Sequence, residues 1–319
     1  MKKKLLILTV IICLFANTTA AFAQKPTLDE GGFILIDADT GVVLHEYNSN
    51  TKMYPASTTK MMTALLALEM GQLDQEMTAS KEAVYDIGKD GSNIGIMPGE
   101  VMPMGDLLKA LMVSSANETA NIIAENLCET RQDFVDLMNK KALELGTTNT
   151  HFSNPCGAHE ADLYTTPADL AKIARYAMTI EGFRELAKMK SYQLAPTNKH
   201  SSWPVLSTTN RLMRFDDGED FKIEGIKTGY TGPAGHNLVS YAIDKNGFAL
   251  ISVVMGQKSY NSQQRVRSFS KELLAYGFNN FERVKLIEKG TVYETVEVKD
   301  AKDDPVLNLV TDGDVFYTL

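Results

Sequence analysis

Two residues at the start of an apolar segment could carry out nucleophilic chemistry. Ser57 and Lys60 stand three apart, and apolar or small residues follow them up to Glu69. Residues three apart share one face of a helix, so the hydroxyl and the amine can touch. Burial favours the neutral amine, which can take the proton of the hydroxyl. The pattern therefore predicts acyl transfer through Ser57, with backbone N–H groups at the helix start facing the developing negative charge.

The same S-x-x-K spacing occurs at two other places, which serve as a comparison. Ser49 and Lys52 lie in a polar run, and Ser268 and Lys271 lie on an amphipathic helical pattern. Both pairs are expected at the surface. Only the first pair opens a segment that is apolar on all sides, as is typical of a buried helix.

Two further motifs carry polar side chains suited to the same chemistry. Ser115-Ala116-Asn117 lies between helical segments, where a hydroxyl and an amide can project from a short loop. Lys227-Thr228-Gly229 lies in an expected strand, and its glycine leaves room for another backbone. An exposed strand edge can bind an extended peptide as an added strand. The three motifs together predict a serine enzyme that acts on a peptide.

The N-terminus and the net charge bear on compartment and partners. Three lysines precede an apolar run, and Ala21-Phe22-Ala23 fits a cleavage site, so residues 1–23 are expected to form a secretory signal peptide. Loss of these three lysines would take the net charge from −8 to −11. An acidic exported protein is a poor partner for nucleic acid.

The histidines and cysteines make a metal centre an unfavoured interpretation. The five histidines show no metal-ligand spacing, so no metal and no cofactor are expected. Cys128 and Cys156 would remain after cleavage and could pair in an oxidising compartment, but the sequence leaves their redox state open.

The order of periodic segments predicts an α+β fold. Alternating patterns indicate a hairpin at residues 33–47 and strands at 221–230, 236–243 and 248–255. Helical patterns cover 105–113, 118–127, 132–145, 167–178 and 262–276, and the region 70–103 indicates loops with short helical pieces. We expect the first and last segments to share one antiparallel sheet flanked by helices. Residues 26–281 would form this domain, and 282–319 the start of a small β-rich one.

In these motifs the chain resembles the serine-type D-alanyl-D-alanine carboxypeptidases, the low-molecular-mass penicillin-binding proteins of peptidase family S11. The resemblance extends to residues 54–63, 113–120, 150–157 and 225–239. It implies a β-lactamase/transpeptidase-like fold. It also implies that the enzyme removes the terminal D-alanine of peptidoglycan stem peptides through an acyl-enzyme, and that β-lactams inhibit it covalently. No cofactor is implied.

The resemblance also implies a role for each motif residue. Ser57 would be the nucleophile, Lys60 its base and Ser115 a proton relay. The substrate would be bound by Asn117, Lys227, Thr228, Gly229 and Tyr230. Relatives carry one arginine near the start of the last helix for the substrate carboxylate, and either Arg265 or Arg267 could fill this role.

Rival functions stay open at this level. A class A β-lactamase would need an aspartate where Ala116 stands and a glutamate for deacylation, which we do not find. A non-catalytic wall-binding protein and an endopeptidase are further alternatives. Relatives usually continue into a complete β domain and an amphipathic membrane-anchoring helix, whereas this chain stops at Leu319. Membrane association is thus expected only through an anchor absent from this chain, at an extracytoplasmic location.

Overall fold

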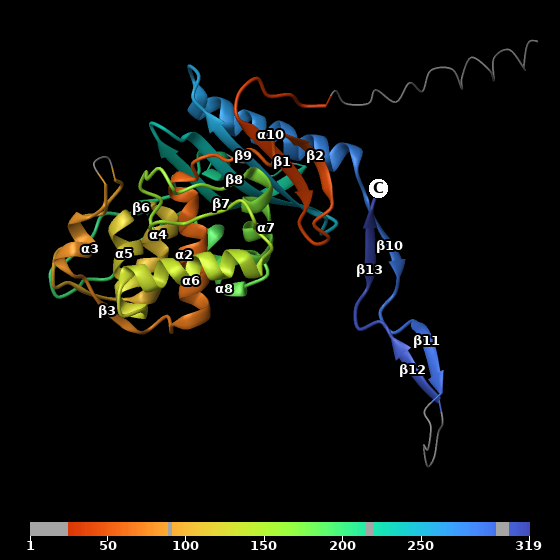
Figure 1. The fold of residues 1–319 in the computed structure, drawn as a ribbon, viewed down its shortest axis with the longest axis horizontal. Coiled ribbons are helices and arrows are strands. Elements are labelled where there is room, and N and C mark those ends of the chain that lie inside the picture. The colour runs from red at the N-terminus through yellow and green to blue at the C-terminus, as the bar shows by residue number, and fades with distance from the viewer. Residues whose placement is uncertain (1–24, 89–90, 215–217, 219, 298–305) are drawn as a thin grey trace, which may run out of the picture.

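The computed structural model describes residues 25–88, 91–214, 218, 220–297 and 306–319, and the expected signal peptide lies outside them. Its centre is a five-stranded antiparallel sheet of order β2-β1-β9-β8-β7 (Figure 1). The strands are β1 (Gly32–Asp37), β2 (Val43–Tyr47), β7 (Phe221–Thr231), β8 (Gly235–Asp244) and β9 (Ala249–Gln257). Gly32 pairs with Met255, so the first and last segments share one sheet, as predicted.

The sheet separates two apolar layers because successive side chains of a strand point to opposite faces. Phe33 and Leu35 pack with α10 (Ser262–Asn280) on one face. Ile34 and Ile36 join the core of the helical layer on the other face.

The helical layer encloses α2 (Lys60–Met70), which is buried from Lys60 to Ala67. Around it lie α4 (Met104–Val113), α5 (Asn117–Leu127), α6 (Arg131–Glu144), α7 (Pro167–Ala177) and α8 (Glu181–Ala187). Local sequence sets the starts of two of them. Thr130 and Asp133 form a capping box on α6, and Thr166 caps α7 ahead of a proline at the first position.

Shorter elements lie around this layer. They are η1 (Ala56–Thr59), β3 (Glu76–Thr78), α3 (Lys81–Tyr85), β4 (Val101–Pro103), β5 (Ser191–Tyr192), β6 (Leu206–Ser207) and α9 (Arg211–Arg214). Two of them, η1 and α9, contact the sheet. The short helical piece expected within residues 70–103 is α3, and the paired strands β3 and β4 were not expected.

One surface expectation is wrong. Ser49 is buried, its hydroxyl donates to Glu46 at 2.5 Å, and its carbonyl accepts the N–H of Ala168 at 2.9 Å. Ser49 therefore packs against the start of α7, while its neighbours Asn48, Asn50 and Thr51 are exposed. Lys52, Ser268 and Lys271 are exposed, as expected.

The last strands extend away from the main body (Figure 1). They are β10 (Arg283–Ile287), β11 (Val292–Glu297), β12 (Val306–Val310) and β13 (Val315–Thr318), which pair as β10-β13 and β11-β12. Side chains of Arg283 and Thr318 bond to Asp39 and Asp37 at the end of β1. A separate domain at 282–319 stays a prediction.

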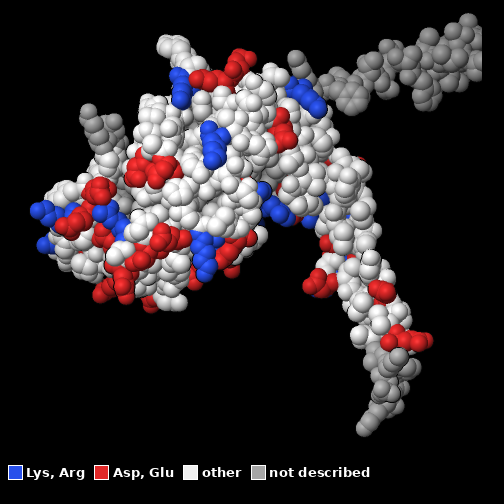
Figure 2. Space-filling model, viewed as in Figure 1, with Lys and Arg blue, Asp and Glu red and all other residues white. Residues whose placement is uncertain are grey.

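Acidic side chains gather over the helical layer in the view of Figure 2, in keeping with the net charge of −8. Within the described ranges, no helix combines the length and apolarity that crossing a bilayer requires.

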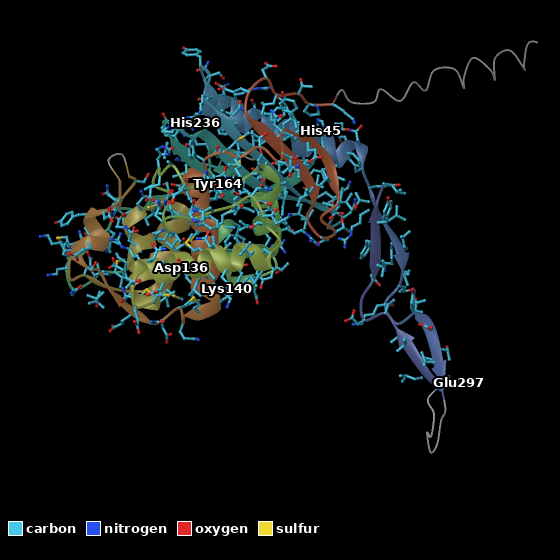
Figure 3. The ribbon with its side chains drawn as sticks, in the orientation of Figure 1. His45, Asp136, Lys140, Tyr164, His236 and Glu297 are labelled. Atoms are coloured by element: carbon cyan, nitrogen blue, oxygen red, sulfur yellow. The ribbon has the colours of Figure 1, made fainter. Side chains whose placement is uncertain are left out.

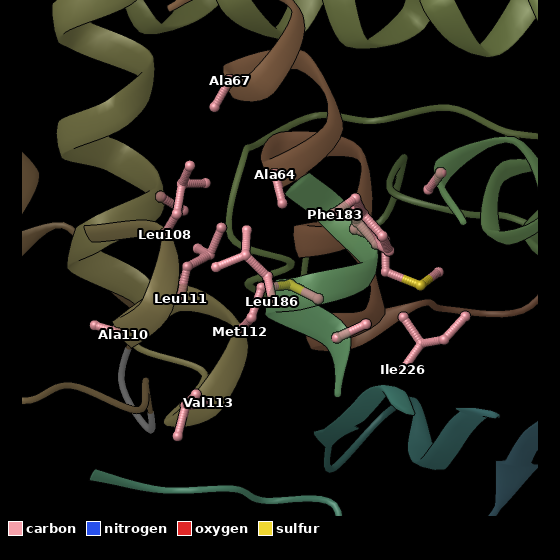
Figure 4. Close-up of a cluster of buried hydrophobic side chains, with 14 of the residues drawn as sticks. Ala64, Ala67, Leu108, Ala110, Leu111, Met112, Val113, Phe183, Leu186 and Ile226 are labelled. Atoms are coloured by element: carbon pink, nitrogen blue, oxygen red, sulfur yellow. The ribbon is translucent and has the colours of Figure 1, made fainter. Parts of the chain in front are cut away.

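Leu108 gives a test of the core around α2. Its side chain is 0% exposed and lies among Ala64, Leu111 and Leu186 (Figure 4). Leu108→Ala is expected to lower the free energy of unfolding by roughly 3–5 kcal/mol, because it removes buried methyl groups and leaves a cavity. Urea denaturation followed by circular dichroism measures this loss. Leu143→Ala is the control, since Leu143 is 68% exposed on α6 and should change stability by less than about 0.5 kcal/mol.

Candidate active site

The amine of Lys60 lies at the centre of a buried polar cluster. Its Nζ donates to Ser57 Oγ at 2.9 Å, to Asn117 Oδ1 at 2.6 Å and to the Cys156 carbonyl at 2.6 Å. The Lys60 side chain is fully buried, and this burial lowers its pKa to about 8, although Cys156 and Glu118 act in the opposite direction. The amine is thus held next to the hydroxyl of Ser57 on η1, and a larger fraction of it is neutral than for an exposed lysine.

A second buried lysine lies beside a second serine. Lys227 Nζ, on β7, donates to Ser115 Oγ at 2.9 Å and to the Thr228 carbonyl at 3.1 Å. Burial and the positive charge of Lys60 hold the pKa of Lys227 well below its usual value. Ser115 has a φ of 62°, in the left-handed region that serine rarely adopts. Such backbone strain is typical of positions where a fixed side-chain direction matters.

The loop between α3 and β4 is bound to the cluster by Asn117 and Glu118, the first two residues of α5. Asn117 Nδ2 donates to the Ile87 carbonyl at 2.7 Å, and its backbone N–H donates to the Ser92 carbonyl at 2.7 Å. The buried carboxylate of Glu118 accepts the Ile94 N–H at 2.7 Å, and burial raises its pKa. Glu118 is a further polar residue of the site that was not predicted, although its position next to the second motif was a usable signal.

Two glycines allow the backbone around Ser57 to be enclosed. A Cβ at Gly229 would lie 2.7 Å from the Pro55 carbonyl oxygen and 3.2 Å from Ser57 N. A Cβ at Gly157, whose φ is +83°, would lie 2.0 Å from the Ala56 carbonyl oxygen. Both positions therefore require glycine. Asn237 on β8 completes the enclosure by donating to the Tyr54 and Pro55 carbonyls at 2.9 and 3.0 Å.

A cavity of about 260 Å³ opens on one side of Ser57 and carries positive charge. Thr228, Arg211 and Arg267 line it together with Ser115. The two guanidinium-bearing residues line the same cavity, and burial and the charge of Arg211 lower the pKa of Arg267. This pair would attract a carboxylate.

Arg265 and Arg267 differ in what they contact. Arg265 points to Glu272 at 3.2 Å and to the Thr27 carbonyl at 3.2 Å, outside this cavity. Arg267 lines the cavity. Sequence reasoning missed Arg211, since nothing in its neighbourhood marks it and only tertiary packing brings α9 to β7.

A second cavity, of about 450 Å³, opens on the other side of Ser57. Asn117, His159, Tyr230 and Pro233 are among its lining residues. The exposed ring of Tyr230 stacks on His236 at a centroid distance of 4.3 Å. Ser57 thus lies between a cationic cavity and a larger one that follows the end of β7.

The two cysteines of the described chain do not form a disulfide. Cys128 and Cys156 are both free thiols, and Cys156 is buried, with burial raising its pKa. Across the part of the chain that the structure describes, no three His, Cys, Asp or Glu side chains gather in a way that could hold a metal ion.

Comparisons with known proteins identify the family of the chain. The family model described as D-alanyl-D-alanine carboxypeptidase matches residues 19–259. The D-alanyl-D-alanine carboxypeptidase DacF of Bacillus subtilis is 33% identical over 95% of this chain and 77% of its own length. DacA of Escherichia coli K12 is 30% identical over 95% of this chain and 74% of its own length.

A solved structure confirms the predicted α+β fold. Penicillin-binding protein 5 from Haemophilus influenzae aligns with a TM-score of 0.80 and 29% identity, over 93% of this chain and 84% of its own. With a family model that covers most of the chain and relatives matched over nearly all of it, the chain belongs to the D-alanyl-D-alanine carboxypeptidase family.

Proposed function

We propose that Ser57 is the nucleophile and Lys60 the general base of a D-alanyl-D-alanine carboxypeptidase, a hydrolase that removes the C-terminal D-alanine of a peptide. The observation that carries this assignment is the 2.9 Å contact between a buried amine and the Ser57 hydroxyl. Lys60 takes the hydroxyl proton as Ser57 Oγ attacks the carbonyl carbon between the two D-alanines. The backbone N–H groups of Ser57 and Tyr230 would bind the oxyanion.

Ser115 and Lys227 would return a proton to the leaving amine. Both side chains are buried, their contact is 2.9 Å long, and Ser115 lines the same cavity as Ser57. Loss of D-alanine leaves an acyl-enzyme on Ser57, and water then releases the shortened peptide. Lys227 adds positive charge close to the docked substrate.

The substrate would dock along the edge of β7 as an added strand. β7 is the last strand of the sheet order, so its outer edge carries no neighbouring strand of this sheet. Gly229 and Tyr230 would present backbone groups to the peptide, and Asn117 would contact it through its side-chain amide. Thr228 would donate its hydroxyl to the terminal carboxylate. The cationic cavity would then hold the leaving D-alanine, and the larger cavity the acyl part.

Substitutions of Arg267 and Arg265 test where the terminal carboxylate of the substrate binds. Arg267→Ala is expected to raise KM for a D-alanyl-D-alanine peptide by roughly tenfold or more, because it removes a charge-assisted hydrogen bond in a partly enclosed cavity. Steady-state assay of released D-alanine measures this change. Arg265→Ala, which removes the same charge two residues away, should leave KM within about twofold. Equal effects of the two substitutions would contradict the assignment to Arg267.

The direct test is covalent labelling of the secreted protein. A β-lactam resembles the D-alanyl-D-alanine end, so penicillin should add once to the intact protein, and peptide mapping should place the adduct on Ser57. A pentapeptide ending in D-Ala-D-Ala should release free D-alanine. An adduct without D-alanine release would favour a non-catalytic binder, and rapid nitrocefin hydrolysis a β-lactamase. Cleavage of cross-linked stem peptides would reveal endopeptidase activity.

The cellular setting forms part of the proposal. The substrate would be the stem peptide of peptidoglycan, which lies outside the cytoplasmic membrane, and residues 1–23 would direct export to that compartment. Residues 26–281 would form the catalytic domain and residues 282–319 part of a β-rich one. Nucleic acid is not expected as a partner, because the chain is acidic.

A further inference from the structure

A third cavity adjoins the acyl side of the site and has no role in the chemistry described so far. This distal cavity measures about 500 Å³ and is lined by Lys52, Tyr54, Tyr164, Pro233 and Lys258, with Glu30 and Met53 among the others. It is joined in two ways to the second cavity of about 450 Å³, which is proposed to hold the acyl part of the substrate and is called the acyl-side cavity below. Pro233 lines both cavities, and the ring of Tyr54 packs edge-on against His159 of the acyl-side cavity at 4.5 Å.

The charges around the distal cavity favour an anion. Lys52 Nζ lies 4.0 Å from the centroid of Tyr164, which Figure 3 labels, and this contact holds the ammonium group at the cavity wall. Among the described residues, no carboxylate forms an ion pair with Lys52 or Lys258.

The one carboxylate at the wall is already engaged. Glu30 accepts the backbone N–H groups of Lys258 and Ser259 at 3.0 and 2.9 Å. The Glu30 carboxylate also interacts with the charge of Lys258, so the wall carries two ammonium groups and one carboxylate, a net single positive charge for a ligand.

The direction of the docked peptide leads to this cavity. With its terminal carboxylate near Arg267 and its acyl carbonyl at Ser57, the peptide runs from Tyr230 towards Pro233. β7 ends at Thr231, and residues 232–234 form the turn to β8, so Pro233 lies just beyond the end of the strand. Two residues of an extended peptide reach about 7 Å past the acyl position, towards this turn, which borders both cavities.

We infer that the distal cavity binds a free carboxylate that the stem peptide carries two residues before the acyl D-alanine. The inference rests on the proposed function, because it takes the docking direction from it. Lys52 and Lys258 supply the charge, and Met53 and Pro233 contact the intervening chain. The cavity therefore sets a preference among stem peptides rather than the rate of the chemical steps.

The test compares three synthetic peptides ending in D-Ala-D-Ala. Two are pentapeptides with γ-linked D-glutamate at the second position, one with a free α-carboxylate and one with the carboxamide. The third is an N-acetylated tripeptide that is too short to reach the cavity. The wild-type enzyme should hydrolyse the carboxylate with a kcat/KM roughly fivefold or more above that for the carboxamide, since two partly exposed charge pairs are lost with the amide.

The preference should disappear in a Lys52→Gln, Lys258→Gln double variant. The control is a Lys140→Gln, Lys245→Gln variant, which has the same net charge as the Lys52→Gln, Lys258→Gln variant. Lys140 lies on α6 (Figure 3) and Lys245 lies in the turn after β8, and both are exposed. The control should keep the preference. Equal kcat/KM for the two pentapeptides in the wild type, a preference that survives in the double variant, or one that the control also loses would each overturn the inference. Absence of D-alanine release from the tripeptide would instead contradict the proposed function.

Discussion

Replacing Lys60 with arginine should lower the rate of acylation of Ser57 by roughly a thousandfold or more. Lysine and arginine carry the same charge, but a guanidinium group stays protonated and cannot take the hydroxyl proton. Penicillin adduct formation, followed by mass spectrometry over time, measures the rate. Lys271→Arg is a matched control, because Lys271 belongs to an exposed S-x-x-K pair and should react like the wild type. Near-normal acylation of the Lys60→Arg protein would contradict the role of Lys60 as base.

The same assignment sets the pH dependence. Burial favours the neutral amine and lowers the pKa of Lys60 to about 8. At pH 7 about a tenth of the molecules therefore carry Lys60 in the neutral form that can act as a base. Below this pKa the acylation rate should rise about tenfold per pH unit, and above it the rate should level off. The rise with pH should be absent from the Lys60→Arg protein. A rate that falls as pH increases from 6 to 8 would exclude a neutral Lys60 as the reactive form.

Substituting alanine for Gly157 should disable the enzyme even though Gly157 carries no reacting group. The new Cβ would lie 2.0 Å from the Ala56 carbonyl oxygen and 3.0 Å from Ser57 N, so the backbone at the nucleophile must move. A misplacement of about 1 Å can reduce a rate about a hundredfold. The neighbouring Cys156 carbonyl, which holds Lys60, would shift as well. Penicillin acylation and thermal unfolding together measure the two consequences.

Gly146→Ala separates crowding from backbone strain. Gly146 also has a positive φ, +72°, but a Cβ there would meet nothing within 4 Å. This variant should lose about 1–2 kcal/mol of stability from the left-handed conformation and keep its acylation rate. If the two variants lost activity equally, close packing at Gly157 would not be the cause.

The helices and strands that could be predicted from the sequence are those marked by a local pattern of apolar residues. The run after Lys60 is apolar on all sides, and the strands from Phe221 onwards follow a clear pattern, so both were predicted. The motifs also fixed which hydroxyls and amines to examine, because their chemistry depends on residue type and spacing. The roles assigned to them stay predictions that the labelling experiments test.

What sequence reasoning missed depends on tertiary packing. Arg211 reaches the cavity through the four-residue helix α9, which is too short to leave a periodic pattern. Ser49 is buried only because α7 returns over it. The difference between Arg265 and Arg267 comes from the rotation of α10 against the sheet, which the sequence around them does not specify. Glu118 depends on a loop some twenty residues earlier in the chain.

The pairing of β1 with β9 also bears on how the enzyme matures. Ser57 emerges early in synthesis, whereas Lys227, the partner of Ser115, and the strand that closes the sheet against β1 emerge some 170 to 200 residues after Ser57. Such distant pairing slows folding, because chain entropy is lost before the contacts form. We therefore expect the nascent protein to become reactive only when nearly the whole domain is present. Labelled penicillin, applied during refolding, would report completed molecules alone.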